Sequence, residues 1–214
     1  MSAPTVFIVD DDAAVRDGLS LLVETAGLQA EAYPSAETFL AALKPDRTGC
    51  IVLDVRMPGM PGPALQAELG RRGVSLPIIF LTAHGDIPTS VQAMKAGAVD
   101  FLTKPVDGAL MLERVHAAIE RNSQERKRAG EQRNLRGRLA LLTMREREIL
   151  ALAFAGHPNK EIARHLGISY RTVEVHRSRI LLKTGATSLI ELARLAAACG
   201  LDLSGEGAAD PAAR

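Results

Sequence analysis

The sequence is poor in aromatic residues and in cysteine. Aromatic residues make up 3% of the 214 positions and tryptophan is absent, so the cores must be built from Leu, Ile, Val and Ala. The two cysteines, Cys50 and Cys199, lie in apolar surroundings without CxxC or Cys/His spacing. This pattern predicts reduced, buried thiols rather than a disulfide. The five histidines show no metal-ligand spacing either, so no zinc site is expected.

Long apolar runs are also missing. Charged residues interrupt even the stretch that ends at 192–200, so no segment is expected to span a membrane. The first five residues carry neither the basic region nor the apolar region of a signal peptide. With 47% hydrophobic residues, the chain can still bury packed cores. These features predict a cytoplasmic protein with no membrane partner.

The small net charge of +1 conceals two halves of opposite sign. Residues 1–122 carry 10 Lys and Arg against 15 Asp and Glu, a net charge of −5. Residues 123–214 carry 16 against 10, a net charge of +6. An acidic half joined to a basic half suggests that one part handles a cation and the other a polyanion.

The first half alternates strand and helix patterns. Five strands are predicted, at 6–9, 29–33, 50–53, 77–82 and 99–103, and those at 6–9 and 50–53 are short continuous apolar runs. Helical patterns follow each strand, the last from Gly108 past Glu120. Buried strands that alternate with helices predict an α/β doubly wound, five-stranded parallel sheet. In the flavodoxin-like order 2-1-3-4-5, the ligand site lies at the carboxyl ends of the strands.

Polar side chains stand at those strand ends. Asp10 and Asp11 follow the first strand, Asp54 ends the third, Thr82 ends the fourth and Lys104 follows the fifth. Clustered carboxylates repel one another unless a cation neutralises them, and hard oxygen ligands suit Mg²⁺. A carboxylate held in this way can attack phosphorus and form an aspartyl phosphate. Lys104 and the Thr82 hydroxyl could then stabilise the phosphoryl oxygens.

The segments VDDD, LDVRMPGM, FLTAHGD and FLTKP resemble the receiver domain of two-component response regulators, over about residues 4–121. The resemblance implies that Asp54 is the phosphoacceptor. It also implies that Mg²⁺ is held by Asp10, Asp11, Asp54 and the main-chain carbonyl of Arg56.

The same resemblance implies roles for residues around this pocket. Thr82 and Lys104 would complete the site, with a cis peptide between Lys104 and Pro105. Phe101 is similar to an aromatic switch that moves with Thr82, although its position also fits plain core. Asp12 fits the start of a helix better than a ligand. We hypothesise that Arg56 and His84 overhang the phosphoryl group and control water access.

A charged segment separates the two halves. Residues 122–138 are rich in Arg and contain no Pro, which fits either a flexible linker or an exposed continuation of the preceding helix, and we predict the helix. At the other end of the chain, small and polar residues predict a disordered tail at 202–214.

Residues 139–201 show only helical patterns, which predict an all-α domain of four helices. Thr143 with Glu146 forms a capping box, and Asn159, Ser169 and Ser188 are expected to cap the next three helices. Within the middle pair, Ala163, Gly167 and Val173 have the spacing of a helix-turn-helix: a small residue at the crossing, a glycine in the turn and an apolar anchor.

The outer face of the third helix carries groups that suit DNA. Val175 suits a thymine methyl, Glu174 could accept from a cytosine amino group, and Ser178 lies on the same face. The surrounding donors suit phosphates. They are Lys160, Arg171, Thr172, His176, Arg177, Arg179 and Lys183.

The segment from LTMREREIL to RILLKTGA resembles the LuxR-type helix-turn-helix domain, and the chain to about Gly200 resembles the FixJ-like branch of the NarL/LuxR response regulators. The resemblance implies a transcription factor that takes a phosphoryl group from a sensor histidine kinase. It would form a homodimer on phosphorylation, bind double-stranded promoter DNA and act on RNA polymerase. It implies no enzyme beyond hydrolysis of its own phosphoryl group (autophosphatase activity).

Two alternatives stay open at this stage. One is a receiver whose output domain binds a protein. The other is a phosphatase with an aspartate nucleophile, but such enzymes carry a second carboxylate two residues after the nucleophile, where this chain has Arg56.

Overall fold

The computed structural model describes residues 3–44, 46–83 and 87–201, without the side chains of residues 87–90. The chain divides into two compact units between Glu125 and Arg126. His84 and the predicted tail at 202–214 lie outside the described residues. None of the described helices is both long and apolar enough to cross a bilayer.

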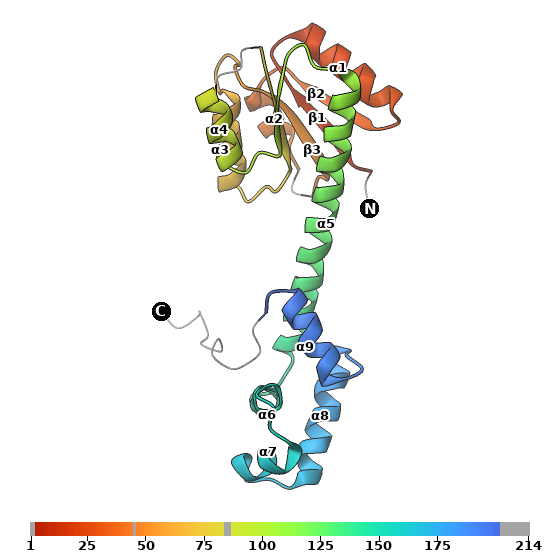
Figure 1. The fold of residues 1–214 in the computed structure, drawn as a ribbon, viewed down its shortest axis with the longest axis vertical. Helices are drawn as coiled ribbons and strands as arrows, with labels where there is room; N and C mark the ends of the chain where they lie inside the picture. The colour runs from red at the N-terminus through yellow and green to blue at the C-terminus, as the bar shows by residue number, and fades with distance from the viewer. Residues whose placement is uncertain (1–2, 45, 84–86, 202–214) are drawn as a thin grey trace. The chain divides into compact units, whose positions relative to one another are not determined.

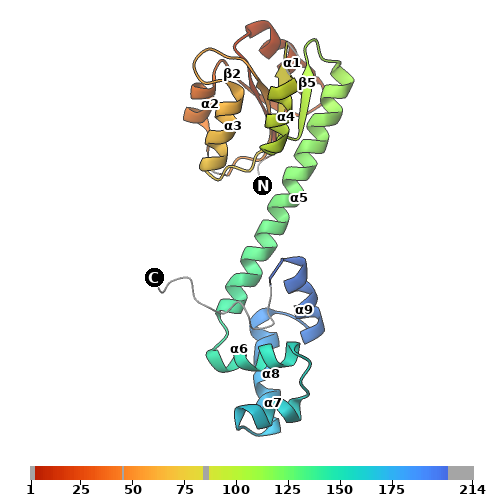
Figure 2. The ribbon, with the colours of Figure 1, turned by 60° about the vertical axis from the view of Figure 1, so that its left-hand side comes forward.

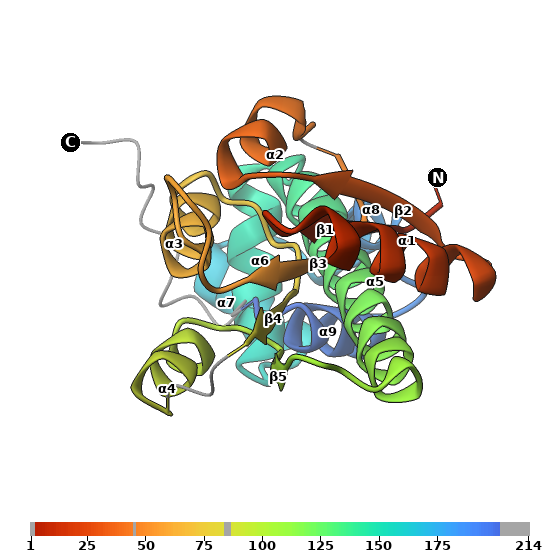
Figure 3. The same cartoon turned by 90° about the horizontal axis from the view of Figure 1, so that it is seen from above.

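The first unit is built on a parallel sheet. Its strands are β1 (Thr5–Val9), β2 (Gln29–Tyr33), β3 (Gly49–Asp54), β4 (Ile78–Thr82) and β5 (Asp100–Thr103). They lie in the order β2-β1-β3-β4-β5, and every neighbouring pair is parallel (Figure 3). The predicted fold class and strand order are therefore confirmed, with strand bounds that differ by one residue in four of the five strands.

Helices cover both faces of this sheet (Figures 1 and 3). The helices are α1 (Ala13–Thr25), α2 (Ala36–Ala42), α3 (Gly62–Arg71), α4 (Ile87–Lys95) and α5 (Gly108–Ala140). Side chains alternate along each strand, so Ile8 and Val52 pack with α1 and α5, whereas Phe7 and Leu53 pack with α2 and α3. The strands β1, β3 and β4 are buried on both faces, which is why they are nearly continuous apolar runs, whereas β2 (QAEAY) at the edge of the sheet is partly exposed.

The second unit contains the distal part of α5 and four more helices (Figure 2). These are α6 (Met144–Phe154), α7 (Asn159–Leu166), α8 (Tyr170–Thr184) and α9 (Leu189–Ala198). Helices α6 and α7 both pack on α8. The predicted four helices of this domain are confirmed, and Ile149, Val173 and Ile180 are fully buried in their core.

The charged segment at 122–138 is helical, as predicted, but it is not merely an exposed connection. Asn122 is buried, and its amide donates to the Ser75 carbonyl at 2.9 Å. Leu135 packs in the core of the second unit, and Gln132 donates to the Cys199 carbonyl at 2.6 Å. The two units thus take up residues that the charge pattern alone assigned to a linker.

Most of the predicted helix starts are confirmed. Asp12, Thr143, Ser169 and Ser188 cap helices through their side chains, and Ser35 caps α2 in the same way. The prediction that Asn159 caps its helix was wrong. Pro158 is the capping residue there, and Asn159 is the first helical residue. Its side-chain oxygen accepts instead from Arg177 of α8.

Both cysteines are free thiols, as predicted. Cys50 is fully buried in the sheet, and burial raises the pKa of its thiol to about 12, so it stays protonated at neutral pH. Cys199 is half-buried at the end of α9.

Candidate functional site

The carboxyl edge of the parallel sheet carries a cavity of about 310 Å³. Parallel register brings the ends of β1, β3, β4 and β5 to this edge, so residues far apart in the sequence meet there. The cavity is lined by Asp10, Asp11, Asp12, Val15, Asp54, Arg56, Thr82, Ala83 and Lys104. All the strand-end residues predicted for this pocket are therefore brought together.

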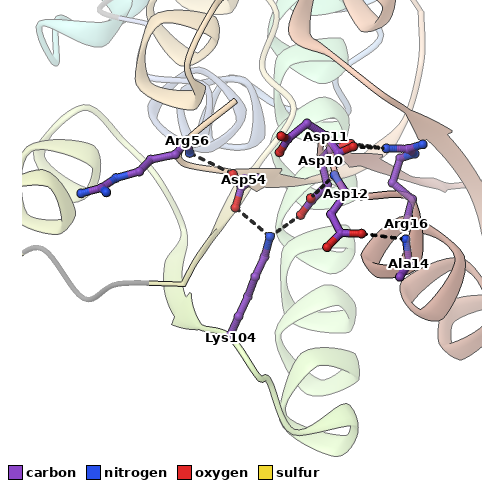
Figure 4. A network of polar contacts seen from close by, with 8 residues as sticks. All are labelled: Asp10, Asp11, Asp12, Ala14, Arg16, Asp54, Arg56 and Lys104. Carbon is purple, nitrogen blue, oxygen red and sulfur yellow. Dashed lines mark hydrogen bonds and ion pairs between the residues drawn. The ribbon is translucent and has the colours of Figure 1, made fainter. Parts of the chain in front are cut away.

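Lys104 is the electrostatic centre of the pocket (Figure 4). Its ammonium lies 2.6 Å from an Asp10 carboxylate oxygen and 2.8 Å from an Asp54 carboxylate oxygen. Asp10 is 1% exposed and Asp54 6% exposed, so both carboxylates are almost withdrawn from water. The peptide bond between Lys104 and Pro105 is cis, as predicted. One half-buried ammonium thus faces two buried carboxylates.

The excess of negative charge shifts the proton equilibria. Burial raises the pKa of Asp54, and the Asp10 carboxylate raises it further. The contacts with Lys104 and the Arg56 main-chain N–H lower it by less, so it stays above its ordinary range. Burial lowers the pKa of Lys104, but the hydrogen bonds and charges of Asp10 and Asp54 raise it by more. Lys104 is therefore cationic at neutral pH.

The loop after β1 is held by hydrogen bonds between side chains and main-chain atoms (Figure 4). The Asp12 amide donates to Asp10 at 3.0 Å, and the Asp12 side chain accepts from the Ala14 amide at 2.8 Å. Asp12 is thus the start residue of α1, as predicted. The Arg16 guanidinium donates to the carbonyls of Asp10 and Asp11, at 2.8 and 2.9 Å. Sequence reasoning missed Arg16, although one helical turn separates it from Asp12.

The turn after β3 presents its main chain to Asp54. The Arg56 amide donates to the second Asp54 oxygen at 2.9 Å, while its guanidinium points away from the carboxylates (Figure 4). Glu37 of α2 accepts from the Met60 amide at 2.9 Å and so fastens the far end of this turn. The hypothesis that Arg56 overhangs the reacting group has no contact in its support here.

No three His, Cys, Asp or Glu side chains in the described part of the chain are arranged to hold a metal ion as they stand. Lys104 contacts both buried carboxylates directly, and Asp11 is exposed at the rim of the cavity. The oxygen donors nevertheless suit a hard cation, since they line one cavity with two buried carboxylates and one ammonium. A cation there would compete with Lys104 for Asp10 and Asp54.

Thr82 and Phe101 were predicted to move together. Thr82 is buried at the end of β4. Phe101 of β5 is half-buried against the core under α3 and α4, and its ring centre lies 6.1 Å from that of Phe80. The Phe101 side chain therefore packs against the core on one side and is partly exposed to solvent on the other.

The helix-turn-helix has the predicted geometry. Gly167 has a φ of 63°, which ends α7 in the left-handed conformation that glycine tolerates. Val173 is fully buried, and Val175 is 44% exposed on the opposite side of α8. The exposed members of the predicted DNA-binding set are Lys160, Arg171, Glu174, Val175, Ser178 and Arg179.

The other predicted DNA-binding residues are partly engaged within the unit. Lys183 donates to the buried Glu146 carboxylate at 2.6 Å and to the Leu141 carbonyl at 3.1 Å. Arg177 contacts Asn159, and the Thr172 amide completes the Ser169 cap. His176 is half-buried, and its Nδ1 has no hydrogen-bond partner among the described residues. The Lys183 ammonium is thus already paired with the Glu146 carboxylate inside the unit.

The comparisons with known proteins match both units. Residues 6–116 match the model of the response regulator receiver domain, and residues 140–196 match that of the bacterial regulatory proteins of the luxR family. The transcriptional regulatory protein FixJ of Azorhizobium caulinodans is 44% identical over 92% of this chain and 93% of its own length. The transcriptional regulatory protein TdiR of Thauera aromatica is 46% identical over 89% of this chain and 84% of its own.

Solved structures agree. The response regulator StyR superimposes with a TM-score of 0.84 at 44% identity, over 92% of this chain and 99% of its own. The receiver domain of FixJ superimposes with a TM-score of 0.52 at 43% identity, over 56% of this chain and 96% of its own.

The charge excess in the pocket predicts that Asp54→Asn increases the free energy of unfolding at pH 7. The pKa of Asp54 is higher in the folded state, so its stabilising contribution is full below the unfolded value of 3.8 and is lost as the pH rises through the folded value. At pH 7 the charged group therefore destabilises the fold. Urea unfolding measures the difference.

Asp11→Asn is the matched control, because Asp11 is exposed beside the same strand end, and it should change stability by less than about 0.5 kcal/mol. A loss of stability in Asp54→Asn at pH 7 would contradict the account of the pocket.

Proposed function

The chain belongs to the response regulators that join a receiver domain to a LuxR-type DNA-binding domain, and we propose that phosphorylation of Asp54 controls its binding to DNA. The observation that carries the proposal is the contact of the half-buried Lys104 ammonium with two buried carboxylates at the sheet edge. The relatives are named transcriptional regulators, which favours a DNA output over a protein-binding output or a phosphatase.

Asp54 is the nucleophile in this proposal. One of its carboxylate oxygens attacks the phosphorus of a phosphohistidine on a sensor histidine kinase, and the bond between phosphorus and the histidine nitrogen breaks. The imidazole leaves with the electron pair and is protonated. Lys104 and the Thr82 hydroxyl then contact the phosphoryl oxygens, where they offset negative charge. Water later hydrolyses the aspartyl phosphate, so the only enzymatic activity is on the protein itself.

Asp10, Asp11, Asp54 and the main-chain carbonyl of Arg56 would hold Mg²⁺, in keeping with the oxygen donors around the cavity. The bound ion would neutralise charge on the phosphoryl oxygens. Lys104 is required to leave Asp54 when the phosphoryl group arrives, because its present contact is with the attacking carboxylate. The phosphoryl group itself offers Lys104 a new anionic partner.

The phosphoryl group acts on DNA binding through the receiver surface. Thr82 turns toward the phosphoryl group, and Phe101 then fills the space vacated beside β4. The changed surface pairs two chains into a homodimer, so two copies of α8 reach two half-sites of a promoter. The DNA-bound dimer contacts RNA polymerase. Because its target is promoter DNA, the protein acts in the cytoplasm.

The direct test is phosphorylation of the full chain by acetyl phosphate with MgCl₂, followed by intact mass spectrometry. Wild-type protein should gain one phosphoryl group, and removal of Mg²⁺ with EDTA should abolish the gain. Asp54→Asn should gain none. Asp12→Asn is the matched control, because Asp12 serves as a helix cap, and it should be phosphorylated like wild type. Full modification of Asp54→Asn would overturn the assignment.

The DNA interface is tested by comparing two lysines. Lys160 is exposed, whereas Lys183 contacts buried Glu146. On a DNA fragment selected by the wild-type protein from random sequence, Lys160→Ala should reduce the slope of log affinity against log salt by about 1. Lys183→Ala should instead lower the free energy of unfolding by about 1–2 kcal/mol, because it leaves Glu146 without its cation. The reverse pattern would show that Lys183 is the phosphate contact.

A further inference from the structure

Two histidines and a glutamate lie together at α7, in the second unit. His157 precedes the helix, Glu161 lies in its first turn and His165 in its last. The two imidazole ring centres are 5.4 Å apart. His165 is exposed and His157 half-buried, so the cluster is open to solvent. Nothing in the proposed switch uses these residues.

The hydrogen bonds of the two rings fix their tautomers. His157 Nδ1 lies 3.1 Å from a carboxylate oxygen of Glu161, and His165 Nδ1 lies 3.3 Å from the Glu161 carbonyl. A carboxylate and a carbonyl can only accept, so Nδ1 is the donor in both rings. In each neutral ring the proton is then on Nδ1, and Nε2 keeps its lone pair. One residue, Glu161, thereby prepares two ring nitrogens as ligands.

This is the arrangement that metal-binding histidines show in their outer contacts. A ligating imidazole donates its other N–H to a carboxylate or a main-chain carbonyl, which fixes the ring and makes the ligating nitrogen more basic. The ring spacing also fits. Two imidazoles that bind one ion at neighbouring coordination positions, with metal–nitrogen distances of about 2.0 Å, place their ring centres roughly 5 Å apart. Within the cluster the observed separation is 5.4 Å.

We propose that His157 and His165 bind one transition-metal dication through their Nε2 atoms, with Glu161 as the outer partner of both rings. Imidazole pairs favour Ni²⁺, Cu²⁺ and Zn²⁺ over Mg²⁺, so the site is chemically distinct from the acidic pocket. Water completes the coordination, which agrees with the absence of any three-ligand group in the described part of the chain. The proposal revises the expectation, drawn from histidine spacing alone, that the chain has no such site.

The bound ion would brace the helix-turn-helix. The His157 amide donates to the Leu152 carbonyl at 3.1 Å, so His157 is anchored to the end of α6. His165 lies two residues before Gly167, at the turn into α8. An ion bound to both rings therefore links the two ends of α7. Since it binds only the folded arrangement, it raises the melting temperature of this unit.

Titration calorimetry of the full chain with NiCl₂, in buffer that contains excess MgCl₂, tests the site. Ni²⁺ is the probe because it prefers imidazole, and the excess Mg²⁺ occupies the acidic pocket. Wild type should bind one equivalent that is lost in both His157→Ala and His165→Ala. His116→Ala is the matched control, because His116 is an exposed histidine on α5, and it should bind like wild type. Glu161→Gln should bind about 10- to 100-fold more weakly.

Two further readouts separate ligation from unfolding. Nitrogen-15 spectra of the histidine rings with ZnCl₂ should shift the Nε2 signals of two rings in wild type and leave those of His116 unchanged. Without metal, the variants should melt at the wild-type temperature, because these side chains are on the surface. Wild type that binds no Ni²⁺, or histidine variants that keep the same equivalent, would overturn the proposal.

Discussion

The contact of Lys104 with Asp10 and Asp54 depends on the way the receiver fold brings its strand ends together. This contact in turn defines the chemistry of the pocket. A lone buried carboxylate is costly, and two beside each other are more so. Parallel register places the ends of β1 and β3 side by side, and β5 delivers Lys104 to both. With one ammonium for two buried carboxylates, the pocket keeps an excess of negative charge. A bound cation would neutralise this excess and would prepare the pocket for phosphoryl transfer.

The second unit carries an excess of positive charge, whereas the pocket of the first unit carries an excess of negative charge. Three of its basic side chains bind within the unit: Arg138 donates to the Thr184 carbonyl at 3.0 Å, Arg145 contacts the Leu166 carbonyl, and Lys183 neutralises Glu146. These cations stabilise the carboxyl ends of α7 and α8, where the helix dipole is negative. The basic groups that remain exposed, such as Lys160 and Arg171, are the ones that suit DNA phosphates.

The sequence predicted what depends on local pattern and missed what depends on distant contacts. Apolar runs and caps such as Asp12 and Ser169 depend on neighbouring residues, so the strands and most helix starts could be inferred. The pocket could be inferred because strand ends of a parallel sheet must converge. The pair of Lys183 with Glu146 and the anchoring of Asn122 to Ser75 join residues 37 and 47 positions apart, and no local signal marks either. The long-range contacts of the charged segment at 122–138 could not be predicted for the same reason.

The central claim is that phosphorylation of Asp54 and binding of DNA by α8 are thermodynamically coupled, so that each favours the other. Fluorescence anisotropy on one selected DNA site, with and without acetyl phosphate, measures this coupling in the full chain. The account predicts that the donor tightens the Kd of wild-type protein by about 5- to 150-fold and leaves that of Asp54→Asn unchanged. Equal affinity of the wild type under both conditions, or tightening in Asp54→Asn, would contradict it.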